Sequence, residues 1–540
     1  MAAGGHSADR AWWREAVIYH IYPRSFQDSD GDGIGDLPGI LSRLDYLNDG
    51  TPDSLGVDAI WLSPVFPSPL ADFGYDVADY HDVDRVYGGL AALDRLIAAC
   101  HERGIRVLLD FVLNHTSDRH PWFVESRRSR ETRRRDWYYW RDPAPDGGPP
   151  NNWESAFGGP AWTFDEATGQ YYLHSFLPEQ PDLNWQNPEV VEAMAEVMRF
   201  WMRRGVDGFR LDAAGWVLKH PELLDNPMRE DGPSAKGLVT ARVHNYISRD
   251  AAMPWRFIRA VVDECPGRVT VGEAYVPPEV LPLFYHPPEY DGLHLMFNFQ
   301  LIRHNQGEAF TPWAAPVLAK RVHDSEVAIP PPGLTSYAIG NHDVPRFVSR
   351  HDGDGRGQER ARAAALLQMA LRGVPCIYMG DEIGMVDVAV PPERRLDPVD
   401  RDPERTPMQW DRTPGRGFTT GEPWLPFGPE EIDVASQAAD PRSTLSLYRR
   451  AIWTRKREPA LLAGALQGLA ADNDVLTFCR AHTSAPGVFV VVNTAATERV
   501  VPLPRGFEHI LLDTGGCGIE RMNGETRIRL PGLAAAWVKA

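Results

Sequence analysis

Eight short apolar runs recur along the chain, and each one ends in a cluster of polar residues. They begin at Ala16, Val57, Ile105, Val206, Arg268, Leu293, Leu334 and Val374. Between several of them lie stretches with apolar residues at the three- and four-residue spacing of a helix, such as the one from Leu90. Alternating strands and helices indicate a parallel sheet, and eight such units with polar ends predict a closed (β/α)8 TIM barrel. A doubly wound sheet is disfavoured because no glycine-rich phosphate turn follows the first run.

Two stretches interrupt this alternation, about 116–185 and about 386–440, and the pattern changes again near the C-terminus. Residues 116–185 are rich in Trp, Gly, Pro and charged residues, so we expect an inserted subdomain after the third strand. Short alternating runs near the C-terminus predict an antiparallel β-sandwich. The predicted domains are a barrel of residues 1–115 and 186–458, an inserted subdomain of residues 116–185 and a C-terminal β domain of residues 459–540.

Composition argues against several classes of function. The 540 residues carry a formal charge of −18, which repels phosphate backbones and anionic lipid, so neither nucleic acid nor a membrane is an expected partner. The five cysteines form no C-x-x-C pair and indicate neither a disulfide framework nor a zinc site. The first residues lack the basic and apolar regions of a secretory signal, which predicts a cytoplasmic location. We expect a monomer or homodimer that acts on a small molecule.

Three acids stand directly after apolar runs: Asp212, Glu273 and Asp343. The carboxyl ends of barrel strands meet at one face, so these side chains should converge there. Cleavage of a glycosidic bond requires two carboxyl groups, one at the anomeric carbon and one that protonates the leaving oxygen. Each acid alone could instead cap a helix or pair with an arginine, as Arg210 could with Asp212. Further polar residues make that alternative weaker: Asp110, Asn114 and His115 at the end of a fourth run, and His342 beside Asp343.

Five short motifs in order make the chain resemble the α-amylase superfamily, glycoside hydrolase family 13. They are DFVLNH (110–115), QPDLNW (180–185), GFRLDA (208–213), GEAY (272–275) and NHD (341–343). The likeness extends over nearly the whole chain and is strongest to the α-glucosidase and oligo-1,6-glucosidase branch. It implies a glycoside hydrolase with the barrel fold.

The resemblance also implies roles for individual residues. Asp212 corresponds to the nucleophile, Glu273 to the general acid and base, and Asp343 to the acid that stabilises the distorted sugar ring. The residues expected to donate hydrogen bonds around the same glucose are His115, Arg210 and His342. The implied mechanism retains the anomeric configuration through a glucosyl ester on Asp212. It requires a protonated Glu273 with a raised pKa beside an ionised Asp212.

Two further motifs, GYDVADY from Gly74 and RTPMQW from Arg405, resemble mouth loops of exo-acting glucosidases. By this likeness Asp76 and Arg405 bind the non-reducing end of the substrate, and Tyr75 stacks on its sugar ring. A pocket closed in this way would release one glucose at a time. The alternative is a surface turn with a structural Asp–Arg pair, worth about 0 to 1 kcal/mol if exposed.

The linkage preference rests on conflicting signals. QPDLNW resembles the oligo-1,6-glucosidase form, whereas Ala213 is small where α-1,6-specific relatives carry Val. Ala213 therefore favours α-1,4-linked maltose and short malto-oligosaccharides. Rival hypotheses are an oligo-1,6-glucosidase, a transglucosylase or an isomerase that converts sucrose or trehalose. A non-catalytic scaffold, like the amylase-shaped subunits of amino-acid transporters, would have a membrane anchor and lack the catalytic carboxylates.

The segment DSDGDGIGD offers an oxygen-rich loop suited to a hard cation. It imitates the start of an EF-hand, but its twelfth position is Gly39 rather than Glu. Related glucosidases hold a structural Ca²⁺ in such a loop, and Mg²⁺ is an alternative ion. The implied ligands are Asp28, Asp30, Asp32, the carbonyl of Ile34, and Asp36. A solvated acidic turn without an ion is the simpler alternative.

Overall fold

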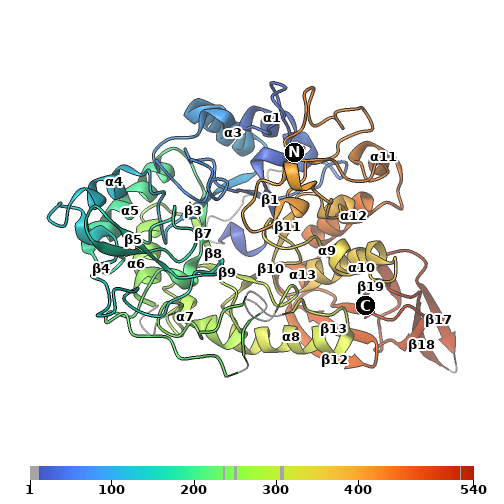
Figure 1. Cartoon of the computed structure of the whole chain (residues 1–540). Coiled ribbons are helices and arrows are strands. Elements are labelled where there is room, and N and C mark those ends of the chain that lie inside the picture. The colour runs from blue at the N-terminus through green and yellow to red at the C-terminus, as the bar shows by residue number, and fades with distance from the viewer. Residues whose placement is uncertain (1–10, 231, 235–236, 248–251, 304–308, 523) are drawn as a thin grey trace.

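The computed structural model describes residues 11–540 except 231, 235–236, 248–251, 304–308 and 523. Eight parallel strands close into a barrel in the order β1-β11-β10-β9-β8-β7-β3-β2, as predicted (Figure 1). Each of the eight predicted apolar runs supplies one strand. The strands are β1 (Ile18–Ile21), β2 (Ala59–Leu62), β3 (Arg106–Val112), β7 (Gly208–Asp212), β8 (Val269–Gly272), β9 (Leu295–Asn298), β10 (Thr335–Ala338) and β11 (Gly373–Tyr378).

The barrel strands are buried because helices cover them from outside. Their sequences are consequently nearly continuous apolar runs rather than alternating ones. Pro188 starts helix α5 (Pro188–Arg203), and the side chain of Asn187 caps it by accepting a hydrogen bond from Glu189 N. The other long helices are α3 (Gly89–Glu102), α6 (Ala252–Asp263), α8 (Ala315–Ala328), α10 (Gly357–Ala370) and α12 (Thr444–Arg457).

The excursion between β3 and β7 forms a small layer beside the barrel. Helix α4 (Pro121–Arg128) precedes a three-stranded sheet of order β4-β6-β5, seen at the left of Figure 1. Its strands are β4 (Trp140–Arg141), β5 (Trp162–Asp165) and β6 (Gln170–Leu173). Aromatic residues build its core, including the buried Trp153 and Trp162. A bridge between His115 and Asp182 ties the layer to the end of β3.

The C-terminal part is an antiparallel sandwich, as predicted. One sheet has the order β12-β13-β14-β19-β16 and the other β15-β18-β17. Their strands are β12 (Ala465–Asp472), β13 (Val475–Ala481), β14 (Val488–Asn493), β15 (Arg499–Pro502), β16 (His509–Asp513), β17 (Gly518–Met522), β18 (Glu525–Leu530) and β19 (Ala535–Lys539). Side chains of both sheets share one apolar cluster, as Val491 and Ile528 do. Helix α10 packs between the barrel and this sandwich, so almost all its faces are buried. The domain limits given above stay a prediction.

The termini of the barrel strands determine where chemistry can occur. Strand β7 pairs with β3 so that Asp110 lies beside Arg210 and Val112 beside Asp212. The end of β8 follows on the other side of β7, with Gly272 paired to Leu211. This register places the predicted acids at one edge of the barrel. Within the described residues, no helix has the length and apolar character needed to cross a membrane.

Candidate active site

Arg210 is the centre of a buried cluster of three carboxyl groups. Its Nη1 donates to Asp110 at 2.8 Å and to Asp212 Oδ1 at 2.7 Å, while its Nη2 lies 3.6 Å from Glu273 Oε2. Because β3, β7 and β8 are adjacent, their ends deliver all four groups to one place. Asp212 and Glu273 thus lie near the two terminal nitrogens of the same guanidinium. The structure brings together the two acids that the sequence singled out for bond cleavage.

The turn after Asp212 orients Glu273. Ala213 has a φ of 51°, a left-handed conformation that costs a non-glycine residue about 1 to 2 kcal/mol. In this conformation its amide donates to Glu273 Oε2 at 3.0 Å, and the amide of Ala214 donates to Glu273 O at 2.9 Å. The strained turn therefore holds the carboxyl of Glu273 next to the end of β7.

The three acids share too little positive charge to be ionised together. Burial raises the pKa of both Asp212 and Glu273, and the guanidinium of Arg210 acts against burial at both groups. Arg210 stabilises the Asp212 anion by a direct hydrogen bond, but it lies farther from Glu273. We therefore assign the shared proton to Glu273, whose anion the arginine stabilises less.

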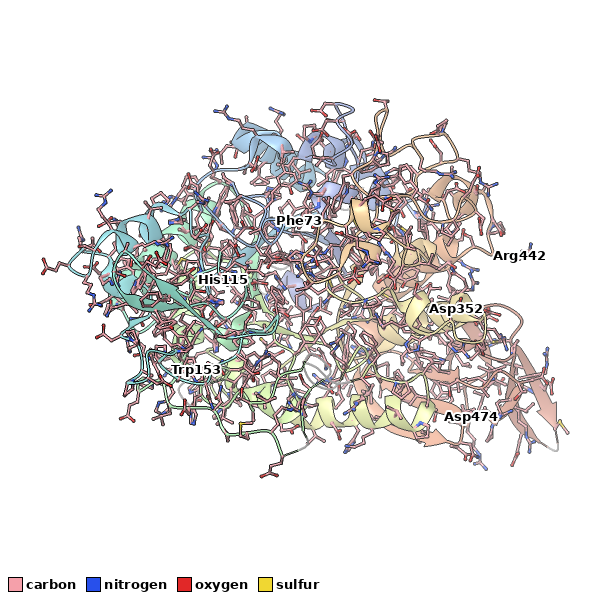
Figure 2. The ribbon with its side chains drawn as sticks, in the orientation of Figure 1. Phe73, His115, Trp153, Asp352, Arg442 and Asp474 are labelled. Carbon is pink, nitrogen blue, oxygen red and sulfur yellow. The ribbon has the colours of Figure 1, made fainter. Side chains whose placement is uncertain are left out.

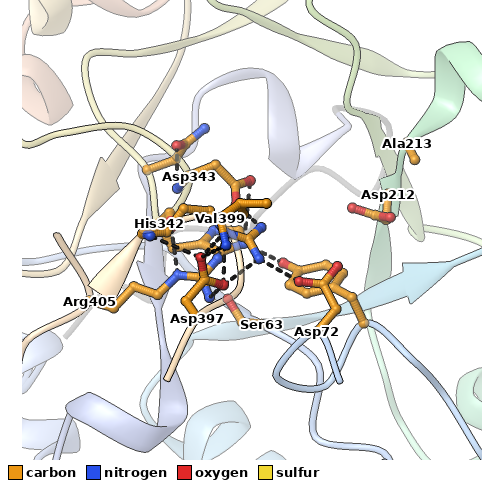
Figure 3. A network of polar contacts seen from close by, with 12 residues as sticks. Ser63, Asp72, Asp212, Ala213, His342, Asp343, Asp397, Val399 and Arg405 are labelled. Carbon is orange, nitrogen blue, oxygen red and sulfur yellow. Dashed lines mark hydrogen bonds and ion pairs between the residues drawn. The ribbon is translucent and has the colours of Figure 1, made fainter. Parts of the chain in front are cut away.

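Asp343 has the opposite electrostatic environment. Arg401 Nη1 donates to its Oδ1 at 3.0 Å and Arg405 Nη2 donates to the same oxygen at 3.2 Å (Figure 3). Burial acts to raise the pKa of Asp343, but the surrounding positive charges outweigh it and hold the pKa below its ordinary value. Burial also lowers the pKa of His342 well below 6.5, so this neighbour is neutral and the two arginines supply the charge. Asp343 is consequently an anion.

Two histidines lie beside these acids as neutral groups. The hydroxyl of Tyr75 donates to Asp110 Oδ2 at 3.0 Å and lies 2.6 Å from His342 Nε2. His115 Nε2 lies 3.2 Å from the carbonyl oxygen of Tyr75. Burial lowers the pKa of His115 to about 4. Neutral imidazoles can donate hydrogen bonds to sugar hydroxyls without adding charge to the site.

Some of these groups line one cavity of about 260 Å³, whereas Arg210 and His342 are not part of its lining. Its lining includes the acids Asp212, Glu273 and Asp343. Apolar and aromatic faces complete the wall, as is usual for small-molecule sites. Those that sequence reasoning missed are Phe157, Phe176, Trp216, Tyr246 and Tyr275. They lie in loops or, like Trp216, in a short 3-10 turn, so they produce no periodic pattern. The signals that pointed to some of them were the aromatic residues of segment 116–185 and the motif GEAY.

Two further predicted binding residues, Asp76 and Arg405, also lie outside the cavity lining. The carboxylate of Asp76 is fully buried and accepts hydrogen bonds from Ser68 Oγ, Ala71 N and Asp72 N, so it closes its own turn instead of facing the cavity. Arg405 is also fully buried and supports Asp343 from behind the lining.

Their places in the cavity wall belong to Asp72 and Arg401, each four residues earlier in the sequence. Arg401 forms ion pairs with Asp72, Asp343 and Asp397, and thereby links two mouth loops (Figure 3). Gln180 from QPDLNW donates to Asp72 Oδ2 at 2.9 Å and holds that carboxylate in position.

The acidic loop after β1 brings three of its predicted ligands together. Carboxylate oxygens of Asp28, Asp30 and Asp36 lie within 4.8 Å of one another. Asp32 is not in this group, and its Oδ1 accepts a hydrogen bond from Ile34 N at 2.8 Å. Asp36 also caps helix α1 (Leu37–Ser42) by accepting from Gly39 N. The convergent oxygens suit a hard cation.

The chain is similar to known proteins over nearly its whole length. The model of the alpha-amylase catalytic domain matches residues 20–464. A probable alpha-glucosidase of Rhizobium meliloti is 43% identical over 523 residues, with 92% of each chain covered. The oligo-1,6-glucosidase of Parageobacillus thermoglucosidasius is 37% identical over 545 residues, with 94% of each chain covered.

Solved structures also match nearly the whole length of the chain. The alpha-glucosyl transfer enzyme XgtA superposes with a TM-score of 0.89 and 38% identity, covering 98% of this chain and 99% of that one. The trehalulose synthase MutB from Pseudomonas mesoacidophila gives a TM-score of 0.88 and 34% identity, with 98% and 99% covered.

Proposed function

Because the chain belongs to the α-amylase catalytic-domain family, we propose that it is a retaining, exo-acting α-glucosidase. It releases glucose from the non-reducing end of maltose and other short α-glucosides. The observation that carries the proposal is the placement of Asp212 and Glu273 on the two terminal nitrogens of Arg210, with both acids in the wall of one cavity. One of these acids is an anion and the other holds a proton, as double displacement requires.

In the first step Asp212 attacks the anomeric carbon of the glucosyl unit. The bond from that carbon to the leaving oxygen breaks, and Glu273 transfers its proton to this oxygen. The product is a glucosyl ester on Asp212 with inverted configuration. Arg210 stays bonded to Asp110 throughout, so the guanidinium remains positioned while the charge on Asp212 is consumed.

In the second step the ionised Glu273 takes a proton from water. The oxygen of that water attacks the anomeric carbon, and the bond to Asp212 breaks to return the free carboxylate. Two inversions give net retention. Asp343, kept anionic by Arg401 and Arg405, stabilises the positive charge that develops on the sugar ring in both transition states.

The ion pairs of Arg401 support exo-cleavage. They connect the loop of Asp72 to the loop that follows β11, across one side of the cavity. A long polysaccharide needs an open groove that extends past the cleaved bond in both directions. The cavity of about 260 Å³ instead suits a small ligand held by one end.

The preference for α-1,4 links is part of this proposal. Ala213 lies in the cavity wall directly after Asp212, and its left-handed backbone disfavours a β-branched residue there. A methyl-sized change in a sugar pocket is worth about 1 to 3 kcal/mol of discrimination. The oligo-1,6-glucosidase relatives keep the α-1,6 alternative open, and comparing the kcat/KM values for maltose and isomaltose decides between them.

Transglucosylation is a second candidate function, favoured by the likeness to a glucosyl transfer enzyme and a trehalulose synthase. A sugar hydroxyl replaces water in the second step, with Glu273 again taking the proton. Aromatic walls such as Trp216 and Tyr246 offer flat faces for such an acceptor. A non-catalytic scaffold is not favoured, because the catalytic acids and their arginines are all present.

A structural Ca²⁺, or Mg²⁺, at the acidic loop is also proposed. Asp28, Asp30 and Asp36 would supply carboxylate oxygens to it, and the ion would tie the loop to the start of α1. Chelator should then lower the melting temperature, with recovery on added Ca²⁺. The five free cysteines suit a reducing compartment, and on that ground we propose that the enzyme acts in the cytoplasm.

A substrate panel tests the main proposal. Purified protein is offered maltose, isomaltose, sucrose, trehalose and soluble starch, and glucose and new oligosaccharides are followed with time. We expect glucose from maltose as the first product, with transfer products at high maltose concentration. Rapid conversion of starch into long dextrins would contradict the closed pocket.

A further inference from the structure

A carboxyl group in the cavity wall, that of Glu404, is not used by the mechanism above. Glu404 ends the short helical turn η9 (Asp402–Glu404), between the two arginines that bind Asp343. Only 3% of the residue is exposed, yet it is part of the cavity lining. Across the described residues, its carboxyl has no hydrogen bond or ion pair with another residue, and it interacts with its own backbone amide.

The neighbours of Glu404 are already occupied by other partners. Arg405 donates to Asp343 and to the carbonyl of His342, and Arg401 is taken up by three carboxylates. A buried polar group whose hydrogen bonds are incomplete costs up to about 1 to 3 kcal/mol. Proteins therefore rarely keep one, and a group of this kind in a cavity wall points to a ligand that completes its hydrogen bonds.

The charges around Glu404 decide which form of the acid meets the ligand. Burial raises the pKa of Glu404 to about 8, Arg405 acts against this shift, and the anions Asp387 and Asp343 add to it. At pH 7 the group is therefore a neutral carboxylic acid. A neutral acid offers one O–H donor together with acceptor oxygens, whereas the anion only accepts.

We propose that Glu404 is a substrate-binding residue that exchanges hydrogen bonds with a hydroxyl group of the bound sugar. The proposal rests on the proposed function, because it takes an α-glucoside as the ligand. Sugar hydroxyls both donate and accept, so a neutral acid can serve one as donor and acceptor at once. A carboxylate beside the anionic Asp343 would be a poorer partner, since it cannot donate and repels the lone pairs of the hydroxyl oxygen.

The proposal predicts a specific dependence of KM on pH. As the pH rises through about 8, Glu404 loses its proton and its donor, so the KM for maltose should rise. Glu404→Gln keeps a donor and an acceptor but cannot titrate. Its KM at pH 7 should be within about threefold of the wild-type value, and the wild-type to variant ratio of KM should increase between pH 7 and pH 9. The ratio of the two KM values removes the effect on KM of groups that titrate in both proteins, including Glu273.

The experiment measures kcat and KM for maltose across this pH range in the full-length wild-type enzyme, Glu404→Ala and Glu404→Gln. The alanine variant should raise KM by roughly threefold to tenfold at pH 7, the equivalent of one or two hydrogen bonds, with kcat changed less than KM. Glu431→Ala, at an exposed position on a neighbouring loop, is the matched control and should leave both constants unchanged.

The outcomes separate this inference from the proposed function. A wild-type enzyme that does not cleave α-glucosides overturns both together. If the wild type is active, an alanine variant with unchanged KM, or a KM ratio of wild type to Glu404→Gln that does not vary with pH, overturns the role of Glu404 alone. If Glu404→Ala fails to fold, the pH series of Glu404→Gln decides the question.

Discussion

Arginine side chains are buried at both ends of the barrel, but their partners differ. At the carboxyl ends of the strands, Arg210 and Arg401 are each bonded to several carboxylates. At the amino ends, Arg455 and Arg480 donate instead to backbone carbonyls where helix α10 meets the C-terminal sandwich. Figure 2 shows the side chains over the ribbon and labels Asp474 in that sandwich. In the first group, Arg401 and the carboxyl group of Asp212 that Arg210 binds line a cavity, whereas the second group lies in packed protein.

The pKa values follow this difference. Carboxylates around Arg210 and Arg401 outweigh burial and raise the pKa of each arginine above its ordinary value. At the other end, burial lowers the pKa of Arg455 to about 10 and of Arg480 to about 9, because carbonyl dipoles compensate less than full charges. The comparison indicates that one end sets the charge of reacting groups while the other joins two domains. If the two ends of the barrel have these separate roles, substitutions at one end should change activity and substitutions at the other should change stability.

The largest expected effect is on catalysis alone. Asp212→Asn removes the nucleophile but keeps an oxygen for Arg210, so kcat should fall at least about 1,000-fold while the melting temperature changes little. Maltose assays and a thermal unfolding scan measure both quantities. An active variant would remove Asp212 from the mechanism, and an unfolded one would show that this end also carries the stability of the barrel.

At the amino ends of the barrel strands, we expect a substitution to lower stability without lowering activity. Arg480→Met would leave the carbonyls of Gly464, Ala370 and Leu371 without their donor. The free energy of unfolding should fall by about 1 to 3 kcal/mol, because buried acceptors lose their partner. Denaturant unfolding measures this loss, while kcat/KM at 25 °C should stay at the wild-type value. A large loss of activity in the folded variant would contradict the division.

Substitutions of two aspartates, Asp72 and Asp76, test which of them binds the substrate. Asp72→Asn weakens the bond to Arg401 in the cavity wall and should lower kcat/KM about tenfold to a hundredfold, the range of a misplaced binding group. Asp76→Asn, four residues on, weakens a turn outside the cavity and should lower stability with a smaller effect on activity. The reverse result would restore Asp76 as the binding residue.

The pH dependence of activity is the smallest of these effects. Asp212 must be ionised, so kcat/KM should fall as the pH drops through its pKa, which burial raises above the ordinary value. Glu273 must be protonated, so kcat/KM should also fall as the pH rises through its own raised pKa. The two limbs belong to the coupled pair of acids. A profile with no alkaline limb would contradict the assignment of the proton to Glu273.

The sequence predicted the regular parts of the molecule better than the loops. Apolar runs ending in Asp212, Glu273 and Asp343 define barrel strands, and strand ends meet by geometry, so the acids could be placed together. Asp72 and Arg401 lie in loops, where positions depend on turn hydrogen bonds and long-range ion pairs. The resemblance to family motifs therefore assigned the binding roles to Asp76 and Arg405 instead. Asp76 stabilises its own turn, and Arg405 lies behind the cavity lining.

The central claim is double displacement by Asp212 and Glu273, and the configuration of the first product tests it most directly. Proton NMR of a digest of p-nitrophenyl α-glucoside, whose leaving group gives no anomeric signal, identifies the anomer of the released glucose when it is recorded before mutarotation. Two successive inversions predict α-glucose, with the β anomer appearing only later. β-Glucose as the first product would mean a single inversion and would contradict a glucosyl ester on Asp212.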